Sequence, residues 1–421
     1  MLDASMHWDE ATWLAYHQSQ LSQLLMHAKE HCAFYVERLD HMFRTDGTID
    51  WENWQEVPIV TRSDLRGRAE EMRAKWLPPR HGAICVATSS GSTGVPITVH
   101  TTELAMDISR LAWSRFHQLH GLLPFEGLVE FKAFLPDGQL MSEDTLQVSN
   151  NGVPSTYINR NLSTGDKLRL LKEAGCRILI DTTNHAEVLA HENLRAGSHT
   201  RLNTVIGIGM GFSQVQRDLL KESFGARCLS PYSSKEGTFM AFQCPHDEGH
   251  FHVNSELVYL EVLDTQGLPV SEGKSGRCII TPLFNSAQPL IRYDHGDVVK
   301  LGGQCSCGIR LPVLAAVMGR SDAIFRFPGK QIALTRFDDV MVQRVLQADA
   351  YQFAQIAPMQ IEVRYVSASD AGAEECQQVS NHLRHLLQVD ALITFSRVDA
   401  IPFNAGEKQQ RIVREFEVAA S

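Results

Sequence analysis

Apolar residues recur every three or four positions in several segments of the chain, which is the spacing of helices with one buried face. This pattern predicts helices over residues 8–40, 102–120, 164–174, 186–196 and 213–224. Short apolar runs alternate with the later helices and predict strands over residues 127–134, 177–183, 204–209 and 228–232. Strands separated by helices of this length pair in parallel through right-handed crossovers, and such sheets bind ligands beyond the carboxyl ends of their strands.

The pattern changes after about residue 250. Strands over 257–263 and 277–283 flank a turn region rich in Gly, Pro and Ser, which predicts an antiparallel, barrel-like subdomain. Further strands and helices (337–346, 361–366, 374–387 and 392–398) predict a last unit of ordinary domain size. We therefore expect an α/β protein with a large N-terminal domain over 1–320, built of mixed and parallel sheets with flanking helices. Its barrel-like part covers about 244–318, and a small, mobile α+β domain covers 321–421.

Composition narrows the class of protein. The chain has 421 residues, 43% of them hydrophobic and 21% charged, and a formal net charge of −10. The acidic balance argues against a nucleic-acid partner. We expect no membrane span, because no apolar stretch approaches the roughly 20 residues that one needs. The N-terminus has no basic region followed by an apolar one, and the 9 cysteines are scattered, so we expect a cytoplasmic protein with reduced thiols.

The segment from Val86 to Val99 carries the first candidate chemistry. It places hydroxyl side chains and glycines between Thr88 and Gly94, with β-branched apolar runs on either side. Glycine lets the backbone approach an anion closely, and each amide N–H and hydroxyl is a donor. The segment is therefore either a strand–loop–strand cradle for the phosphates of a nucleotide or an ordinary polar hairpin turn. It is not a Walker-type loop, since no Gly-Lys-Ser/Thr follows.

Other short stretches follow this loop along the chain. They are Tyr232-Ser-Ser-Lys-Glu, Ile291-Arg-Tyr-Asp-His-Gly-Asp, Gly319-Arg-Ser-Asp and Gly406-Glu-Lys-Gln-Gln-Arg. With Thr88-Ser-Ser-Gly-Ser-Thr-Gly-Val-Pro they resemble, in the same order, the motifs of the adenylate-forming superfamily (acyl-CoA synthetases, luciferases, nonribosomal adenylation domains). Pro289-Leu-Ile-Arg-Tyr and Cys305-Ser-Cys-Gly resemble its phenylacetate-CoA ligase branch. The resemblance covers essentially the whole chain.

The resemblance implies a two-step ligase. A small carboxylic acid attacks the α-phosphate of ATP, and the acyl-adenylate is then transferred to a thiol, with coenzyme A as the expected acceptor. An alternative is an enzyme that loads an acyl carrier protein, through its phosphopantetheine arm, or an amine. A third reading, from another class, is a non-catalytic nucleotide-binding relative.

The resemblance also implies roles for residues that match the motifs. The phosphates of ATP would be held by Ser90, Gly91, Ser92, Thr93 and Gly94. Tyr232 would lie along the adenine or the acyl pocket, and Ser233 would contact the nucleotide. Glu236 would bind Mg²⁺, and Asp297 would hold the ribose hydroxyls. Arg320 would reach the ribose or phosphates, Asp322 would be the hinge, and Lys408 would reach the reacting carboxylate and α-phosphate. The structural alternatives are a surface carboxylate for Glu236, a turn aspartate for Asp297 and a solvated side chain for Lys408.

Several positions depart from the motifs. Val95 replaces a common loop lysine, and Lys235 stands where Thr or Ser is usual. Met210 and Gly211 lie where a Gly-x-Glu-Pro motif is common, and Glu407 is an additional residue directly before Lys408. Lys235 either substitutes for the missing lysine or weakens nucleotide binding, so these departures motivate the non-catalytic reading.

Cysteine and histidine residues gather in two short clusters. Cys244 begins a segment that also holds His246, His250 and His252, and Cys305 and Cys307 follow some distance later. Four nitrogen and sulfur ligands in two clusters suit a closed tetrahedral zinc site. We expect Cys244, His252, Cys305 and Cys307 to hold a structural Zn²⁺, with His250 or His246 as rival nitrogen ligands; the alternative is unpaired thiols in a loop.

The acyl pocket in this family lies near the strands around 128–158 and 205–212, where Phe131, Tyr157, Met210 and Gly211 would form its wall. Aromatic walls suit an aromatic acid, although any core contains such residues. The identity of the acid and the oligomeric state, a homodimer being one option, stay open at this stage.

Overall fold

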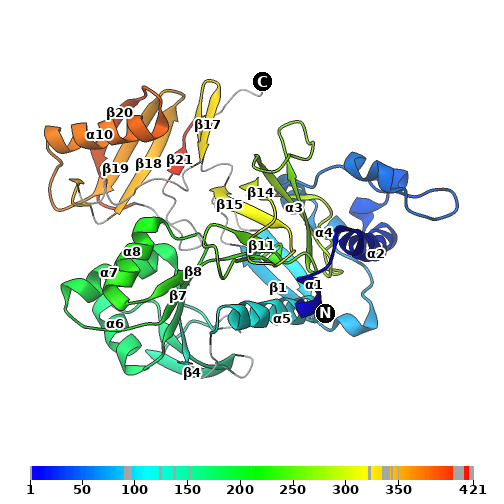
Figure 1. The fold of residues 1–421 in the computed structure, drawn as a ribbon, viewed down its shortest axis with the longest axis horizontal. Coiled ribbons are helices and arrows are strands. Elements are labelled where there is room, and N and C mark those ends of the chain that lie inside the picture. Colours follow the sequence, from blue (N-terminus) through cyan, green and yellow to red (C-terminus); the bar gives the residue numbers. More distant parts are fainter. Residues whose placement is uncertain are drawn as a thin grey trace.

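The computed structural model describes residues 2–89, 97–122, 126–135, 139–150, 153–209, 211–320, 324–333, 342, 345–348, 350–401 and 412–416. The predicted site residues Ser90, Gly91, Ser92, Thr93, Gly94, Met210, Asp322 and Lys408, and the departures Val95 and Glu407, lie outside them. Figure 1 shows the arrangement of the sheets and the helices around them.

The N-terminal segment is helical but less regular than predicted. Helices α1 (Leu2–Ser5) and α2 (Glu10–His31) are followed by the 3₁₀ turns η1 (Ala33–Tyr35), η2 (Asp40–Met42) and η3 (Trp51–Glu56). The predicted helix over 8–40 is therefore too long. Cys32 has extended backbone dihedrals and ends α2, whereas the apolar side chains beyond it are still buried in 3₁₀ turns. The spacing of apolar residues indicates which side chains are buried, and here buried side chains continue beyond the end of the helix.

Short helices lead from this segment to a hairpin. They are α3 (Arg62–Gly67), α4 (Ala69–Met72) and the 3₁₀ turn η4 (Pro79–His81). Thr61 caps α3, since its hydroxyl accepts from the Asp64 amide at 3.2 Å and Asp64 accepts from the Thr61 amide in return. Strands β1 (Ile84–Ser89) and β2 (Ile97–Thr102) then pair antiparallel, and β2 runs directly into α5 (Glu103–Leu119).

A six-stranded sheet forms the lower part of the molecule in Figure 1, with the order β4-β5-β3-β6-β7-β8. The strands are β3 (Leu128–Lys132), β4 (Thr145–Asn150), β5 (Val153–Asn159), β6 (Ile178–Thr182), β7 (Thr204–Ile208) and β8 (Arg227–Leu229). Helices α6 (Thr164–Glu173), α7 (Thr183–Arg195) and α8 (Gln214–Phe224) connect them. Strands β3, β6, β7 and β8 pair in parallel as predicted. The apolar pattern did not predict β5, which pairs in parallel with β3, or β4, which pairs antiparallel with β5 in a hairpin.

A seven-stranded antiparallel sheet follows, with the order β12-β13-β14-β15-β11-β10-β9. Its strands are β9 (Pro231–Ser234), β10 (Thr238–Gln243), β11 (Phe251–Val253), β12 (Val258–Leu263), β13 (Ser275–Pro282), β14 (Tyr293–Leu301) and β15 (Val313–Arg320). The sheet starts at Pro231, earlier than the predicted boundary near 244. The contacts of the Tyr232 hydroxyl show that the sheet curls strongly. From the edge strand β9 this hydroxyl reaches Cys278 on β13 and Asp297 on β14.

The C-terminal part has its own core. Strands β16 (Ile324–Phe327) and β17 (Lys330–Ala333) form a hairpin. A four-stranded sheet has the order β20-β19-β18-β21 and packs against α10 (Ala373–Leu387). Its strands are β18 (Ala350–Ala357), β19 (Gln360–Val366), β20 (Leu392–Arg397) and β21 (Ile412–Arg414). The pattern did not predict β18, and most of the helix predicted over 337–346 lies outside the described residues.

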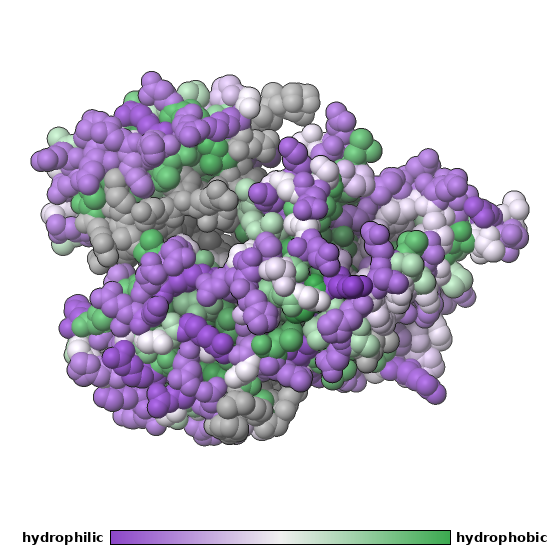
Figure 2. All heavy atoms as spheres, viewed as in Figure 1, coloured by the Kyte–Doolittle hydropathy of each residue, from purple (hydrophilic) through white to green (hydrophobic). Residues whose placement is uncertain are grey.

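The predicted fold class is confirmed: parallel and antiparallel sheets with flanking helices form a large N-terminal part, and a smaller α+β part follows. The boundary at 320/321 stays a prediction, because residues 321–323 lie outside the described part. Figure 2 shows one face of the molecule, on which hydrophilic residues predominate and apolar residues occur in small groups. Among the described residues, no helix has both the length and the apolar character that crossing a membrane requires.

Candidate active site

Two paired strands lie on either side of the predicted phosphate loop, which itself falls outside the described residues. Strands β1 and β2 pair so that Thr88 lies opposite Thr98 and Ser89 opposite Ile97, immediately before and after the loop. The Thr102 hydroxyl accepts from the Ala105 amide at 3.3 Å and caps α5. The strands that precede and follow residues 90–96 therefore pair with each other, and the second of them leads into a helix.

Tyr232, His295 and Asp297 form a buried polar cluster. The Tyr232 hydroxyl donates to Asp297 Oδ2 at 2.7 Å, and His295 Nδ1 lies 2.8 Å from the same oxygen. All three residues are buried, and the two rings meet edge to face at 5.9 Å. Burial, together with the Asp297 carboxylate, raises the pKa of the Tyr232 phenol well above its ordinary value, so the hydroxyl keeps its proton and acts as the donor.

A β-bulge places Asp297 in this cluster. Opposite Cys278, the pairing of β14 with β13 skips from Asp294 to Val298, and Gly296 within the bulge has φ +80°. A residue with a Cβ adopts such a φ only at a cost, so glycine suits this position. Bulges bend a strand and redirect side chains, and they are frequent beside active sites.

The same strand brings two sequence motifs together. Asp297 on β14 is the register partner of Arg320 at the end of β15, and Val298 is the partner of Gly319. These motifs are separated along the chain, yet their backbones lie side by side. The sheet therefore unites the Tyr232, Asp297 and Arg320 motifs.

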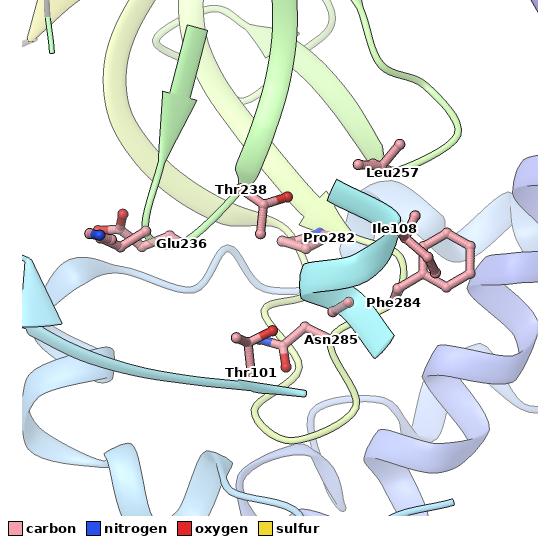
Figure 3. Close-up of a pocket in the computed structure, with 10 residues that line it drawn as sticks. Thr101, Ile108, Glu236, Thr238, Leu257, Pro282, Phe284 and Asn285 are labelled. Carbon is pink, nitrogen blue, oxygen red and sulfur yellow. The ribbon is translucent and has the colours of Figure 1, made fainter. Parts of the chain in front are cut away.

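Glu236 lies in the turn between β9 and β10, beside a small cavity (Figure 3). Glu236 is only 8% exposed. Within the part of the chain that the structure describes, its carboxylate has no hydrogen bond or ion pair. Lys235 in the same turn is exposed. An ionised carboxylate is costly to bury without a partner, so this position suits a bound cation.

The rest of the cavity was not predicted from the sequence. Thr101, Ala105 and Ile108 from β2 and α5 line one part of it, and Leu257, Pro282, Phe284 and Asn285 line another. Thr101 is 6% exposed, and its buried hydroxyl lacks a hydrogen-bond partner among the described residues. No motif marks Thr101, and only its position shortly after the phosphate loop could have drawn attention to it.

The predicted wall of the acyl pocket lies elsewhere. Phe131 on β3 is buried in the core of the six-stranded sheet and meets the His185 ring edge-on at 5.0 Å. Tyr157 on β5 is buried, with the Lys132 ammonium 5.3 Å from its ring centroid. Gly211 precedes α8. None of these residues lines the cavity beside Glu236, so their role in binding the acid stays a prediction.

The predicted metal ligands come together. Cys244 follows β10, His252 lies on β11, and Cys305 and Cys307 lie between β14 and β15; their ligand atoms are all within 4.8 Å of one another. Cys244 Sγ and Cys305 Sγ are 3.7 Å apart, and Cys307 Sγ is 3.3 Å from His252 Nε2. Thiolates about 2.3 Å from one tetrahedral ion would be roughly 3.8 Å apart, whereas a disulfide would need about 2 Å. The rival His250 is more exposed but lies close, with Nδ1 3.4 Å from Cys305 Sγ.

Arg292 is a motif residue whose structural role the sequence did not reveal. Its side chain is fully buried and pairs with Glu261, with Nε 3.2 Å from Oε2. The guanidinium also donates to the carbonyls of Trp54, Gln55 and Val57 at 2.8–3.2 Å. Arg292 therefore joins the N-terminal turns to the strand that carries Asp297.

Comparisons with known proteins agree with this geometry. No family model matches the chain. A phenylacetate-coenzyme A ligase of Thermus thermophilus is 23% identical over 339 residues, covering 78% of this chain and 75% of the relative. A phenylacetate-coenzyme A ligase of Escherichia coli is 20% identical over 408 residues, covering 92% of each.

A solved structure of 2-hydroxyisobutyryl-CoA ligase, in the postadenylation state with an acyl-AMP, superimposes with a TM-score of 0.72 at 17% identity. The match covers 94% of this chain and 88% of that one. The fold is that of the adenylate-forming acyl-CoA ligases. The two sequence relatives are named phenylacetate-coenzyme A ligases, the branch that the motifs of this chain resemble.

Proposed function

We propose that this chain is an ATP-dependent ligase that adenylates a carboxylic acid and transfers the acyl group to coenzyme A. In the first step a carboxylate oxygen bonds to the α-phosphorus of ATP, and the bond to pyrophosphate breaks. In the second step the thiol sulfur bonds to the acyl carbonyl carbon, the thiol proton is lost and AMP leaves. The relatives named as phenylacetate-CoA ligases and the structural neighbour bound to an acyl-AMP support this reaction.

The observation that carries the proposal is the placement of two carboxylates on one curled sheet. Asp297 is held by Tyr232 and His295, and Glu236 is buried without a partner in the described part of the chain. Ionised carboxylates accept ribose hydroxyls well, and they bind hard cations such as Mg²⁺. We assign Asp297 to the ribose and Glu236 to the metal.

The chemistry of Glu236 fits Mg²⁺. When bound, Mg²⁺ would neutralise charge on the ATP phosphates. Lys235, exposed in the same turn, would add a positive charge beside the phosphates. It would take the role of the common loop lysine, whose position Val95 occupies in this chain. Ser90, Ser92 and Thr93 would donate to the phosphates from the loop between β1 and β2.

The remaining assignments rest on the resemblance. Arg320, whose backbone pairs with that of Asp297, would reach the ribose or phosphates. Lys408 would contact the reacting carboxylate and the α-phosphate in the first step, and Asp322 would be the hinge for the movement between steps. We propose an aromatic acid as substrate, because both sequence relatives are named for phenylacetate.

We also propose that Cys244, His252, Cys305 and Cys307 hold a structural Zn²⁺. The support is the donor set, three thiols and one imidazole, and the spacing of these atoms around a common centre. The site would join the β10–β11 hairpin to the loop before β15. It would contribute to folding and take no part in the reaction.

Pyrophosphate release from MgATP tests the proposed function. We expect release with one class among benzoic, arylacetic, cinnamic and short aliphatic acids, and its loss in Lys408→Ala. Adding coenzyme A should give the acyl-CoA, whereas turnover only with a carrier protein or an amine would assign another acceptor. ATP binding without release for any acid would indicate the non-catalytic relative.

A further inference from the structure

We propose that Tyr232 and His295 are positioning residues that orient Asp297 toward the ribose of the nucleotide. This inference rests on the proposed function, since it takes Asp297 as the ribose acceptor. His295 lies two residues before Asp297 in the segment Ile291-Arg-Tyr-Asp-His-Gly-Asp, and Tyr232 lies in another of the short stretches that follow the loop.

The geometry of the cluster supports this role. Tyr232 and His295 both contact Oδ2 of Asp297, at 2.7 and 2.8 Å, so both act on one of the two carboxylate oxygens. The Tyr232 hydroxyl also lies 3.3 Å from His295 Nδ1, and in the tautomer with a proton on Nδ1 both groups donate to Oδ2. Two contacts on Oδ2 restrict the rotation of the carboxylate. A carboxylate held in this way loses little rotational freedom when it binds a hydroxyl.

Both donors are buried and lie on strands of the sheet. Tyr232 is 8% exposed, and its hydroxyl also lies 3.6 Å from Cys278 Sγ on β13. His295 precedes Gly296 in the bulge and is 6% exposed. The edge strand β9 and the bulge in β14 therefore each bring one buried side chain to Asp297.

The chemistry predicts a defect that depends on the ribose. Removing one donor lets the Asp297 carboxylate rotate, which weakens its hydrogen bond to a ribose hydroxyl and leaves adenine and phosphate contacts unchanged. We expect an effect of about tenfold on nucleotide affinity, the size that one charge-assisted hydrogen bond supports. The same change should have no effect on a nucleotide that lacks both ribose hydroxyls.

The test compares AMP with 2′,3′-dideoxy-AMP by calorimetry, and measures KM for ATP and kcat, in the parent, Tyr232→Phe, His295→Ala and His295→Asn. Asparagine can place an amide nitrogen near the position of Nδ1, so it should restore part of the loss. Tyr16→Phe is the matched control, because its partly buried hydroxyl donates to the Glu256 carbonyl at 2.9 Å and does not touch Asp297.

We expect Tyr232→Phe and His295→Ala to bind AMP about tenfold more weakly, to bind the dideoxy nucleotide as the parent does, and to raise KM for ATP with kcat within about twofold. Equal losses for both nucleotides, or losses matched by Tyr16→Phe, would overturn the inference and leave the proposed function standing. A parent that binds neither AMP nor ATP would overturn both.

Discussion

At the scale of single residues, buried charges connect the parts of the site. Arg292 has φ +51°, unusual for a residue with a side chain, and its guanidinium is paired with Glu261 and with backbone carbonyls. The sequence identified Arg292 as part of a motif, but not its partner. That partner lies on another strand, and side-chain spacing along the chain carries no information about which residues face each other across a sheet.

Removing the Glu261 charge should destabilise the protein. Glu261→Gln leaves the Arg292 guanidinium buried without its counter-charge, which costs about 3–5 kcal/mol in comparable pairs. Glu173→Gln is the control, since Glu173 pairs with Arg169 on an exposed helix surface and such pairs contribute about 0.5 kcal/mol. Urea unfolding followed by Trp fluorescence measures both. A loss for Glu261→Gln no larger than that of the control would contradict the assigned role of the pair.

At the scale of elements, the sequence predicted those with a strong period and missed others. The prediction was accurate to within a few residues for the bounds of helices α5, α6, α7 and α8 and of strands β3, β6, β7 and β8. The β4–β5 hairpin and β18 were missed, because short strands with mixed polarity have no distinctive period. The bulge in β14 could not be predicted from the sequence either, although a glycine at position 296, between two polar residues, is compatible with a bulge.

Gly296→Ala tests the bulge. The substitution strains a residue with φ +80°, and we expect KM for ATP to rise about tenfold because Asp297 moves. Gly267→Ala is the matched control: Gly267 has φ +85° in the turn between β12 and β13, with open space around its Cβ position. Both variants should lose about 1–3 kcal/mol of stability. Equal KM values for the two variants would show that the bulge does not position Asp297.

At the scale of the whole molecule, the order of the motifs predicted that they share one site, and the curled sheet brings those of Tyr232, Asp297 and Arg320 together. The sequence could not give the distances, because these depend on strand register. The cluster of Cys244, His252, Cys305 and Cys307 was more predictable. Its donors lie in two short segments, and the antiparallel pairing of β10 with β11 and β11 with β15 brings the segments together.

Metal removal tests the proposed zinc site. We expect the purified protein to contain one zinc per chain, and a strong chelator to lower Tm by several degrees, because a structural metal contributes directly to folding. Cys307→Ser should remove the zinc, and Cys228→Ser, a buried cysteine outside the cluster, should retain it. Elemental analysis and calorimetry measure both effects. Zinc content unchanged in Cys307→Ser would exclude that residue as a ligand.

The most direct test of the central claim is carboxylate-dependent exchange of labelled pyrophosphate into ATP, without coenzyme A. This measurement isolates the first half-reaction and does not depend on the acceptor. We predict exchange with the acid class that supports turnover, and a loss of about a hundredfold in Glu236→Gln, because the variant removes the buried charge assigned to the metal. Exchange at the parent rate in Glu236→Gln, or no exchange with any acid by a parent that binds ATP, would contradict the account.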